Sequence, residues 1–293
     1  MAQPREAPPN QYIVVRYSEA RAATTGAYER LKHESLRGAE AAALLDKLRT
    51  FIDITGKQEL EQTVTNYTQQ MLLSALRVSD RQCPQLQATL ARAQAKIKDV
   101  FGTRAETALK AQLYLKQDVA VNASSLALPS GRPVVFVTDA LVRLLTPQEL
   151  ELVLLHELAH IVYEDSETVV AMKMKMALVS DGTLAGMQKA QKEMSDFNVL
   201  QAGFELTADR AMLECAGAAE WPAVLSMFAK FAGGAAGEPL DGNAFMEQLS
   251  DTQSEIERTI VEAAIAANPH PPLLYRVQEL IRFKQSEITS RMW

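Results

Sequence analysis

The sequence contains few cysteines and histidines and no long apolar run. Only two of its 293 residues are Cys and four are His. Cys83 and Cys215 are too few for a disulfide framework, so we interpret them as ordinary thiols, with one bridge between them as the alternative. No window of about 18 uninterrupted apolar residues occurs, as a membrane-spanning helix would need. The sequence therefore predicts a chain without a membrane-spanning segment.

The sequence also has fewer basic than acidic residues. Thirty Lys and Arg stand against 36 Asp and Glu, which gives a net charge of −6. This balance opposes the attraction to phosphate backbones on which nucleic-acid binding depends. Hydrophobic residues make up 47% of the chain and charged residues 23%, as is typical of a soluble globular protein with a substantial core. We expect no nucleic-acid partner.

The N-terminal residues show no export signal. The first ten include three prolines and no apolar stretch, which favours a flexible leader over residues 1–19. Two locations fit this sequence: the cytoplasm if the N-terminus is native, and the periplasm or the exterior if a leader has been removed.

Periodicity divides the rest of the chain into two parts. Residues 20–115 have a helical pattern that fits three or four helices, and residues 116–290 form the expected catalytic core. β-branched and aromatic runs at Leu113–Leu115 and Val119–Val121, before a turn at Pro129–Gly131, and at Pro133–Thr138 after it predict a small antiparallel sheet. We expect Val134–Thr138 either to pair with an extended substrate or to be simply a strand of the core sheet. The expected fold class is α+β and mainly α.

A histidine pair on one helix indicates metal chemistry. Thr146-Pro147-Gln148-Glu149 is a capping box with Pro at the first helical position, so a helix should begin there and continue to about Tyr163. His156 and His160 are four residues apart on this helix, so that both imidazoles can reach one ion. Glu157 lies next to that face, where it can accept a proton from a metal-bound water. The alternative is a pair of buried histidines that only pack.

Two imidazoles need a third ligand. The residues that follow His160 lack the glycine and histidine of a metzincin, and neither cysteine has the context of a deformylase site. The gluzincin solution is a glutamate on a later helix, usually within an ExxxD pattern, and Glu205 with Asp209 supplies it. The alternative is that these two carboxylates form a solvated helix face. Because both carboxylates share a helix face, Glu205 can bind the metal while Asp209 accepts a hydrogen bond from a ligating histidine.

Several ordered motifs between Val119 and Phe283 resemble the gluzincin metallopeptidases of family forty-eight. This family includes the CAAX prenyl endopeptidases, the HtpX proteases and soluble bacterial relatives. The motifs are Val121-Asn122-Ala123 with Leu128-Pro129, Phe136 to Leu141, Leu145 to Leu150 before the HELAH helix, Phe204 to Arg210, and Asn268 to Pro272 with Arg276.

The resemblance implies a zincin-like fold and a zinc endopeptidase that cleaves internal bonds of peptides or unfolded proteins. One Zn²⁺ per chain would be held by His156, His160 and Glu205, and would activate a water with Glu157 as general base. The membrane helices of the prenyl-protease and HtpX branches are missing from this sequence. We therefore expect a soluble, bacterial-type member and do not transfer the substrates of those branches.

His270 admits three interpretations. It is an ordinary loop residue before two prolines, or, as the resemblance implies, it lies near the active site. There it would stabilise the oxyanion of the reaction or close the open zinc position. In the last case the protein would be a latent enzyme, or a zinc-bearing binding or chaperone-like module without activity. Besides the endopeptidase and the binding module, a structural protein without any metal is the third function class.

Arg276 is expected to be a structural partner of a carboxylate.

Methionines gather in the segment between the two metal-binding helices. Met172, Met174, Met176, Met187 and Met194 all lie there. Such a stripe is typical of core packing, and a substrate groove lined by methionine is the alternative.

Overall fold

The computed structural model describes most of the chain from Ala27 onward. The described residues are 27–55, 57–127, 132–179, 183–234, 241–252, 258–268 and 270–290. The predicted leader over residues 1–19, the turn at Pro129–Gly131 and the side chain of Met176 lie outside them.

Helices account for most of the described structure, which confirms the mainly helical α+β class. The first group comprises α2 (Ala27–Leu31), α3 (Ala39–Thr55), α4 (Lys57–Leu73) and α5 (Pro84–Phe101). The helices around the predicted metal site are α6 (Asp139–Leu144), α7 (Pro147–Val162), α8 (Asp165–Val179) and α9 (Leu184–Ala216). The last group comprises α10 (Trp221–Gly233), α11 (Gly242–Thr252), α12 (Arg258–Ala267) and α13 (Leu273–Ser290). Short 3₁₀ turns lie at Glu34–Leu36, Gly102–Ala105, Ala108–Lys110 and Ala218–Glu220.

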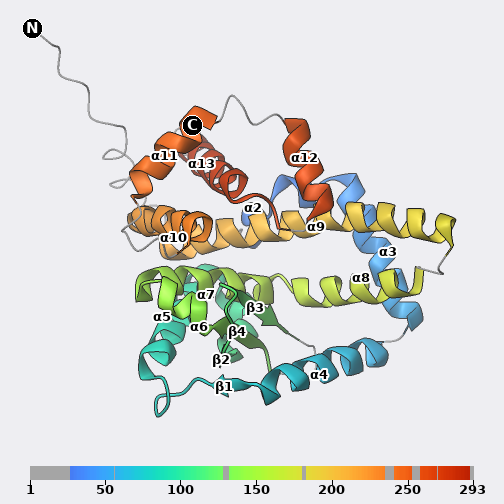
Figure 1. The fold of residues 1–293 in the computed structure, drawn as a ribbon, viewed down its shortest axis with the longest axis horizontal. Coiled ribbons are helices and arrows are strands. Elements are labelled where there is room, and N and C mark those ends of the chain that lie inside the picture. Colours follow the sequence, from blue (N-terminus) through green and yellow to red (C-terminus); the bar gives the residue numbers. More distant parts are fainter. Residues whose placement is uncertain are drawn as a thin grey trace, which may run out of the picture.

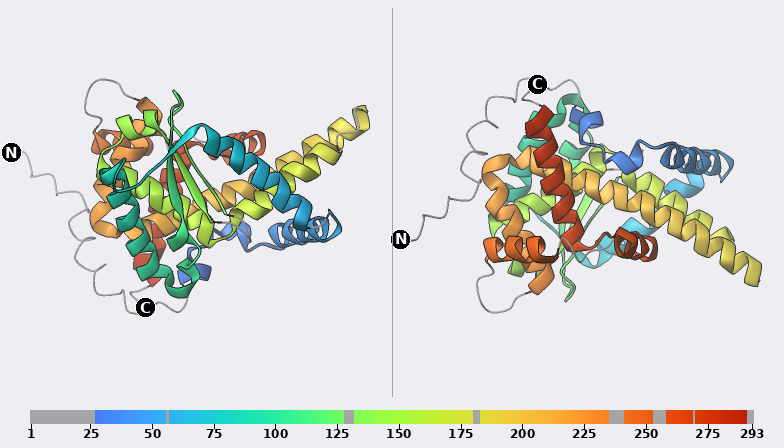
Figure 2. Two further views of the ribbon diagram at one scale, coloured as in Figure 1. Left: turned by 90° about the horizontal axis from the view of Figure 1, so that it is seen from below. Right: turned by 90° about the horizontal axis from the view of Figure 1, so that it is seen from above.

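The helices and the sheet form stacked layers. In Figure 1 the long helix α9 runs above α7 and α8, with α10 at its left-hand end, α11, α12 and α13 above it, and the sheet and α4 below. Figure 2 shows that α8 and the first part of α9 extend away from the rest as an arm, with α3 and α4 beside it. We call α3, α4, α8 and the first half of α9 (residues 184–200) the arm, and the remainder the body.

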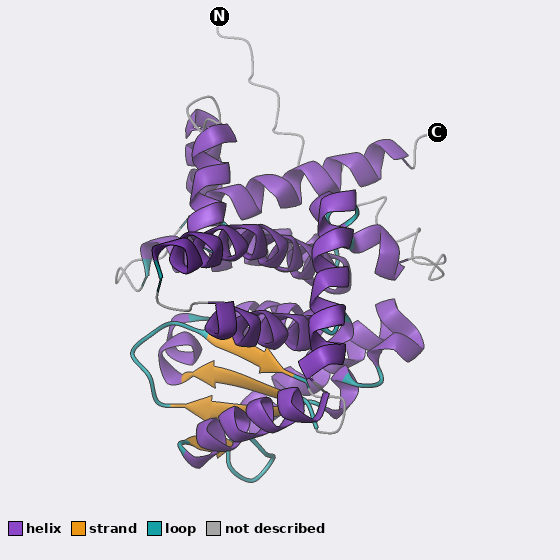
Figure 3. Cartoon of the chain, turned by 90° about the vertical axis from the view of Figure 1, so that its right-hand side faces the viewer, coloured by secondary structure: helices purple, strands orange, loops and turns teal. Residues whose placement is uncertain are grey.

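The sheet lies below α7 and contains four strands (Figure 3). They are β1 (Ala75–Arg77), β2 (Gln112–Lys116), β3 (Ala123–Leu126) and β4 (Val134–Thr138), in the spatial order β1-β2-β4-β3. Strand β3 pairs antiparallel with β4, with Ser124 opposite Phe136. Strand β4 pairs in parallel with β2, with Tyr114 opposite Phe136.

Three expectations about this sheet need correction. The predicted antiparallel sheet is mixed, because β3 occupies the outer place and the hairpin returns β4 between β3 and β2 in the direction of β2. The run Val119–Val121 is not a strand, and its valines are solvent exposed. Strand β4 has a neighbour on each side, so it has no free edge for a substrate.

Helix α7 begins where the capping box places it. The Thr146 side chain accepts a hydrogen bond from the Glu149 backbone N–H, and the Glu149 carboxylate accepts one from the Thr146 N–H. Ser226 and Lys230 of α10 also donate to this carboxylate, each at 2.6 Å. Burial raises the pKa of Glu149, but these donors outweigh burial and lower it. One carboxylate thus caps α7 and fixes it against α10.

The main core surrounds α7. Leu150, Leu154, Leu158 and Ile161 are at most 3% exposed and anchor this helix in the core. Smaller apolar clusters hold the arm together, one of them formed around Met172, Phe197 and Phe204. Met172 is therefore a core residue, as the favoured interpretation of the methionine stripe has it, whereas Met187 and Met194 are exposed. Cys83 and Cys215 are free thiols.

Candidate metal centre

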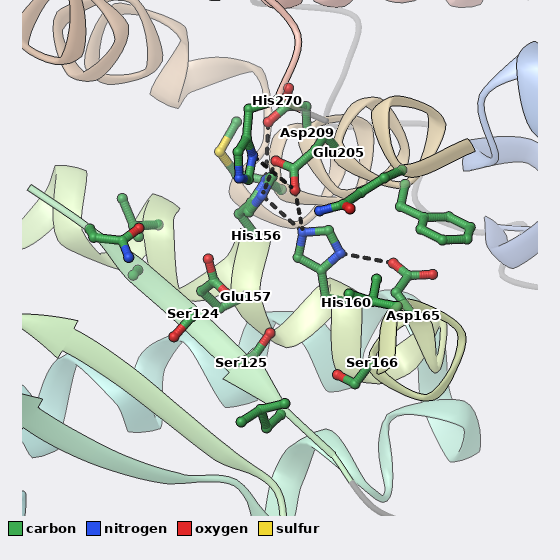
Figure 4. A pocket seen from close by; sticks show the side chains of 18 of the residues that line it. Ser124, Ser125, His156, Glu157, His160, Asp165, Ser166, Glu205, Asp209 and His270 are labelled. Carbon is green, nitrogen blue, oxygen red and sulfur yellow. Dashed lines mark hydrogen bonds and ion pairs between the residues drawn. The ribbon is translucent and has the colours of Figure 1, made fainter. Parts of the chain in front are cut away.

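Side chains from α7 and α9 converge in the middle of the molecule (Figure 4). His156 and His160 lie one turn apart on α7, and their Nε2 atoms are 3.1 Å apart. Glu205 on α9 places Oε2 3.4 Å from Nε2 of His156 and Oε1 3.6 Å from Nε2 of His160. The three potential ligand atoms lie within 4.8 Å of one another. The two helices therefore bring together the three residues that the sequence predicted as ligands.

A carboxylate holds the far side of each imidazole. Nδ1 of His156 lies 3.0 Å from Oδ1 of Asp209, and Nδ1 of His160 lies 2.8 Å from Oδ2 of Asp165. A carboxylate that accepts the Nδ1 proton leaves the lone pair of Nε2 free for a metal and fixes the orientation of the ring. Both Nε2 atoms face Glu205, so this donor set of two imidazoles and one carboxylate fits Zn²⁺.

Arg276 of α13 stabilises the Asp209 carboxylate. Its Nη2 and Nε atoms donate to the two carboxylate oxygens at 2.6 and 2.8 Å. Its guanidinium also lies over the ring of Phe228. Burial raises the pKa of Asp209, but the Arg276 charge and hydrogen bonds outweigh it and lower that pKa. This confirms the prediction that Arg276 is the structural partner of a carboxylate.

The acidic groups also control the protonation of the ligands. Burial alone would lower the pKa of His156, yet Asp209 and Glu205 raise it to about 10. The pKa of His160 is also raised, chiefly by Asp165 acting against burial. The pKa of Glu205 falls well below its ordinary value, because His156 and His270 outweigh the effect of burial. The negative potential that holds protons on these rings equally favours a divalent cation in their place.

A cavity of about 810 Å³ opens next to the histidines. Its wall includes Glu157, which is 7% exposed, and the residues of β3 from Ala123 to Leu126. Figure 4 shows β3 running past Glu157 and His160, with Ser124 and Ser125 on the strand. Glu157 therefore faces the space that a substrate would occupy and is not part of the three-residue cluster.

His270 lies at the mouth of this cavity. Its side chain is 64% exposed, and Nδ1 lies 3.6 Å from Oε1 of Glu205. Its backbone N–H donates to the Asn268 side chain at 3.0 Å, which fixes this part of the loop. His270 is thus a loop residue, as one interpretation has it, and it lies beside a predicted metal ligand.

Sequence reasoning missed Asp165. The chain between α7 and α8 passes through Glu164, which has a positive φ of 60°. This left-handed residue separates the two helices and places Asp165, the first residue of α8, beside His160, five positions earlier. Non-glycine residues seldom adopt that conformation, and no glycine or asparagine marks the turn in the sequence. The signal for Asp165 was therefore only its closeness to the second histidine.

Among the described residues, no helix combines the length and the apolar character needed to cross a membrane.

Comparisons with known proteins agree with this site. The model of peptidase family M48 matches residues 84–283. The plastoglobule-localized metallopeptidase 48 of Arabidopsis thaliana, a chloroplast protein, is 29% identical over 181 residues, which are 59% of this chain and 52% of that protein. The chain thus spans about half the length of this curated relative. No solved structure matches the chain significantly. Because the family model covers well over half of the chain, this protein belongs to peptidase family M48, which points to a metallopeptidase.

Proposed function

We propose that this protein is a zinc-dependent endopeptidase in which His156, His160 and Glu205 hold one Zn²⁺. The observation that carries the proposal is the convergence of these three side chains, with the remaining nitrogen of each ring beside a carboxylate. A bound zinc would activate a water molecule and polarise the scissile carbonyl. The similarity to the metallopeptidase from Arabidopsis supports the reaction class.

Glu157 would move the proton in this reaction. It directly follows one ligand in the sequence and faces the cavity from α7. Its carboxylate would take a proton from the attacking water as the new C–O bond forms. It would then deliver that proton to the leaving amine as the C–N bond breaks.

Strand β3 would bind the substrate backbone. It is the outer strand of the described sheet on the side of α7, and the cavity runs along it. An extended peptide can add to such an edge through main-chain hydrogen bonds, without presenting a free terminus. This arrangement favours cleavage of internal bonds in peptides or unfolded proteins.

The second candidate is a zinc-bearing binding or chaperone-like module that His270 keeps closed. The favouring observation is the position of His270 at the mouth, 3.6 Å from Glu205. His270→Ala separates the two candidates. Lower activity supports an oxyanion role, and activity that appears only in the variant supports a latent enzyme. Zinc binding without hydrolysis in both proteins supports the module.

The proposal is tested with internally quenched peptides and zinc-loaded protein. We expect cleavage that a chelator abolishes and that Zn²⁺ restores. Glu157→Gln should retain zinc and the fold but lose about 10²–10⁴-fold in kcat, because the proton acceptor is gone. Glu151→Gln is the matched control, since Glu151 lies on the same helix but pairs with Arg92 and Lys96. Cleavage by Glu157→Gln at the wild-type rate would contradict the assignment.

A further inference from the structure

Helix α4 contributes an unexpected wall to the cavity. Thr63 and Val64 line the same cavity as His156, His160 and Glu205, although they precede His156 by about ninety positions in the sequence. Helix α4 also lies outside the segment that matches the family, which begins at residue 84. This part of the cavity wall therefore comes from outside the matched segment.

We infer that α4 roofs one end of the substrate cleft and that Val64 makes this end a subsite for a large apolar side chain of the substrate. The inference rests on the proposed peptidase function, and it names the chemical class of residue that the enzyme would select beside the cleaved bond.

The burial of Val64 supports a role in the cleft. Most other described side chains of α4 are exposed or half-buried, whereas Val64 is only 2% exposed. It belongs to none of the core clusters of the described residues. A buried valine at a cavity wall limits how far the cavity extends, so the size of the side chain at position 64 would set the room at this end.

The other walls of this end are mostly apolar. They come from α8, from the end of β3 and from α9: Val169, Val170, Met174, Leu126 and Phe204. Gln201, Ser166 and the exposed Lys173 provide polar groups around them. Binding sites typically combine such apolar walls with a few polar groups. Met174 therefore lines the groove, as the alternative interpretation of the methionine-rich segment has it, whereas Met172 is a core residue.

The subsite is continuous with the reaction centre. Leu126 lies at the end of β3, and Ser124 and Ser125 on the same strand lie beside Glu157 and His160 (Figure 4). A peptide added along β3 would direct alternate side chains to the same side of the strand. The cavity of about 810 Å³ has room for more than one residue. The occupant is thus a side chain of the bound substrate, a few positions from the scissile bond.

Peptide binding to the Glu157→Gln protein tests this subsite without turnover. The probes are a polar ten-residue peptide series in which a single Phe or Leu moves through every position, against an Ala peptide. We expect one position at which the apolar residue improves affinity about tenfold or more. Val64→Trp, which fills the subsite, should remove this preference.

Gln69→Trp is the matched control, because it adds the same indole at an exposed position of α4. It should keep the preference. Val64→Ala is the second variant, in case the indole at position 64 prevents folding, and should shift the preference from Leu towards the larger Phe. A side-chain preference that is absent, or the same in all these proteins, would overturn the inference.

Hydrolysis by the zinc-loaded wild type is measured in parallel. If the wild type cleaves nothing while Val64→Trp still loses the apolar preference in binding, the peptidase proposal fails and the subsite stands. If the wild type cleaves and Val64→Trp shows the same sequence preference in its products, the subsite fails and the peptidase proposal stands.

Discussion

The two ends of the cleft are built differently. At the body end, Val153, Met227 and neighbouring apolar residues belong to the main core around α7. At the arm end, the wall consists of single helices, α4 and α8, held by small clusters around Phe204 and Ile52. A cleft between a thick body and a thin arm can keep its reacting groups fixed while one wall adapts to the substrate. We therefore expect the reacting groups to lie on the body and the residues that select the substrate side chain to lie on the arm.

The residues of the candidate metal site come from both the body and the arm. Asp209 orients His156 from the body and is itself held by Arg276. Asp165 orients His160 from the first residue of α8, which is the start of the arm. The site therefore depends on the position of the arm through one of its two carboxylates.

The largest expected effect is on the body. Arg276→Ala leaves the Asp209 carboxylate buried without its partner, so it should lower the free energy of unfolding by about 3–5 kcal/mol. Arg282→Ala, on the same helix, removes an exposed arginine from Glu279, which keeps His33 as a second partner, and should cost no more than about 1 kcal/mol. Urea unfolding measures both. Equal losses for the two variants would contradict the central place given to Arg276.

An intermediate effect tests the two orienting carboxylates. Asp165→Asn and Asp209→Asn should each weaken zinc binding about 10–100-fold, since each fixes one ligating imidazole. Only Asp209→Asn should also lower stability markedly, because Asp209 pairs with the buried Arg276. Competition with a chromophoric chelator gives the affinities, and exposed Asp99 supplies the control, Asp99→Asn. Unchanged zinc affinity in Asp165→Asn would show that the arm does not reach the metal site.

The smallest effect concerns the segment that leads into the arm. Arg210 of α9 donates two hydrogen bonds to Glu34. Burial raises the pKa of Glu34, but these bonds outweigh it and lower the pKa from 4.5 to about 2. The ionised carboxylate thus stabilises the fold above pH 4.5, and this contribution is lost as the pH falls towards 2.

Glu34→Gln should therefore cost about 1 kcal/mol or less at pH 7, because the Glu34 side chain is 67% exposed. The difference from the wild type should vanish near pH 2. Thermal unfolding across this pH range measures it, with Glu29→Gln as the control on a neighbouring exposed residue. A difference that grows as the pH falls would have the wrong sign for this pair.

The sequence predicted the features that depend on residues close together in the chain. The capping box fixed the start of α7, and four-residue spacing placed His156 beside His160 and Glu205 beside Asp209 on shared faces. The mixed order of the sheet was out of reach, because it depends on where a hairpin returns and not on any strand's own residues. The roles of Asp165 and Val64 were equally hidden. One follows from a left-handed turn at Glu164, and the other from the packing of α4 across the cleft.

Metal analysis of the protein purified without added zinc tests the central claim most directly, when the wild type is compared with Glu205→Ala. The account predicts one zinc per chain in the wild type and a loss of most of it in the variant, because a carboxylate from α9 completes the pair of imidazoles on α7. A wild type without zinc, or a variant that retains a full equivalent, would contradict it.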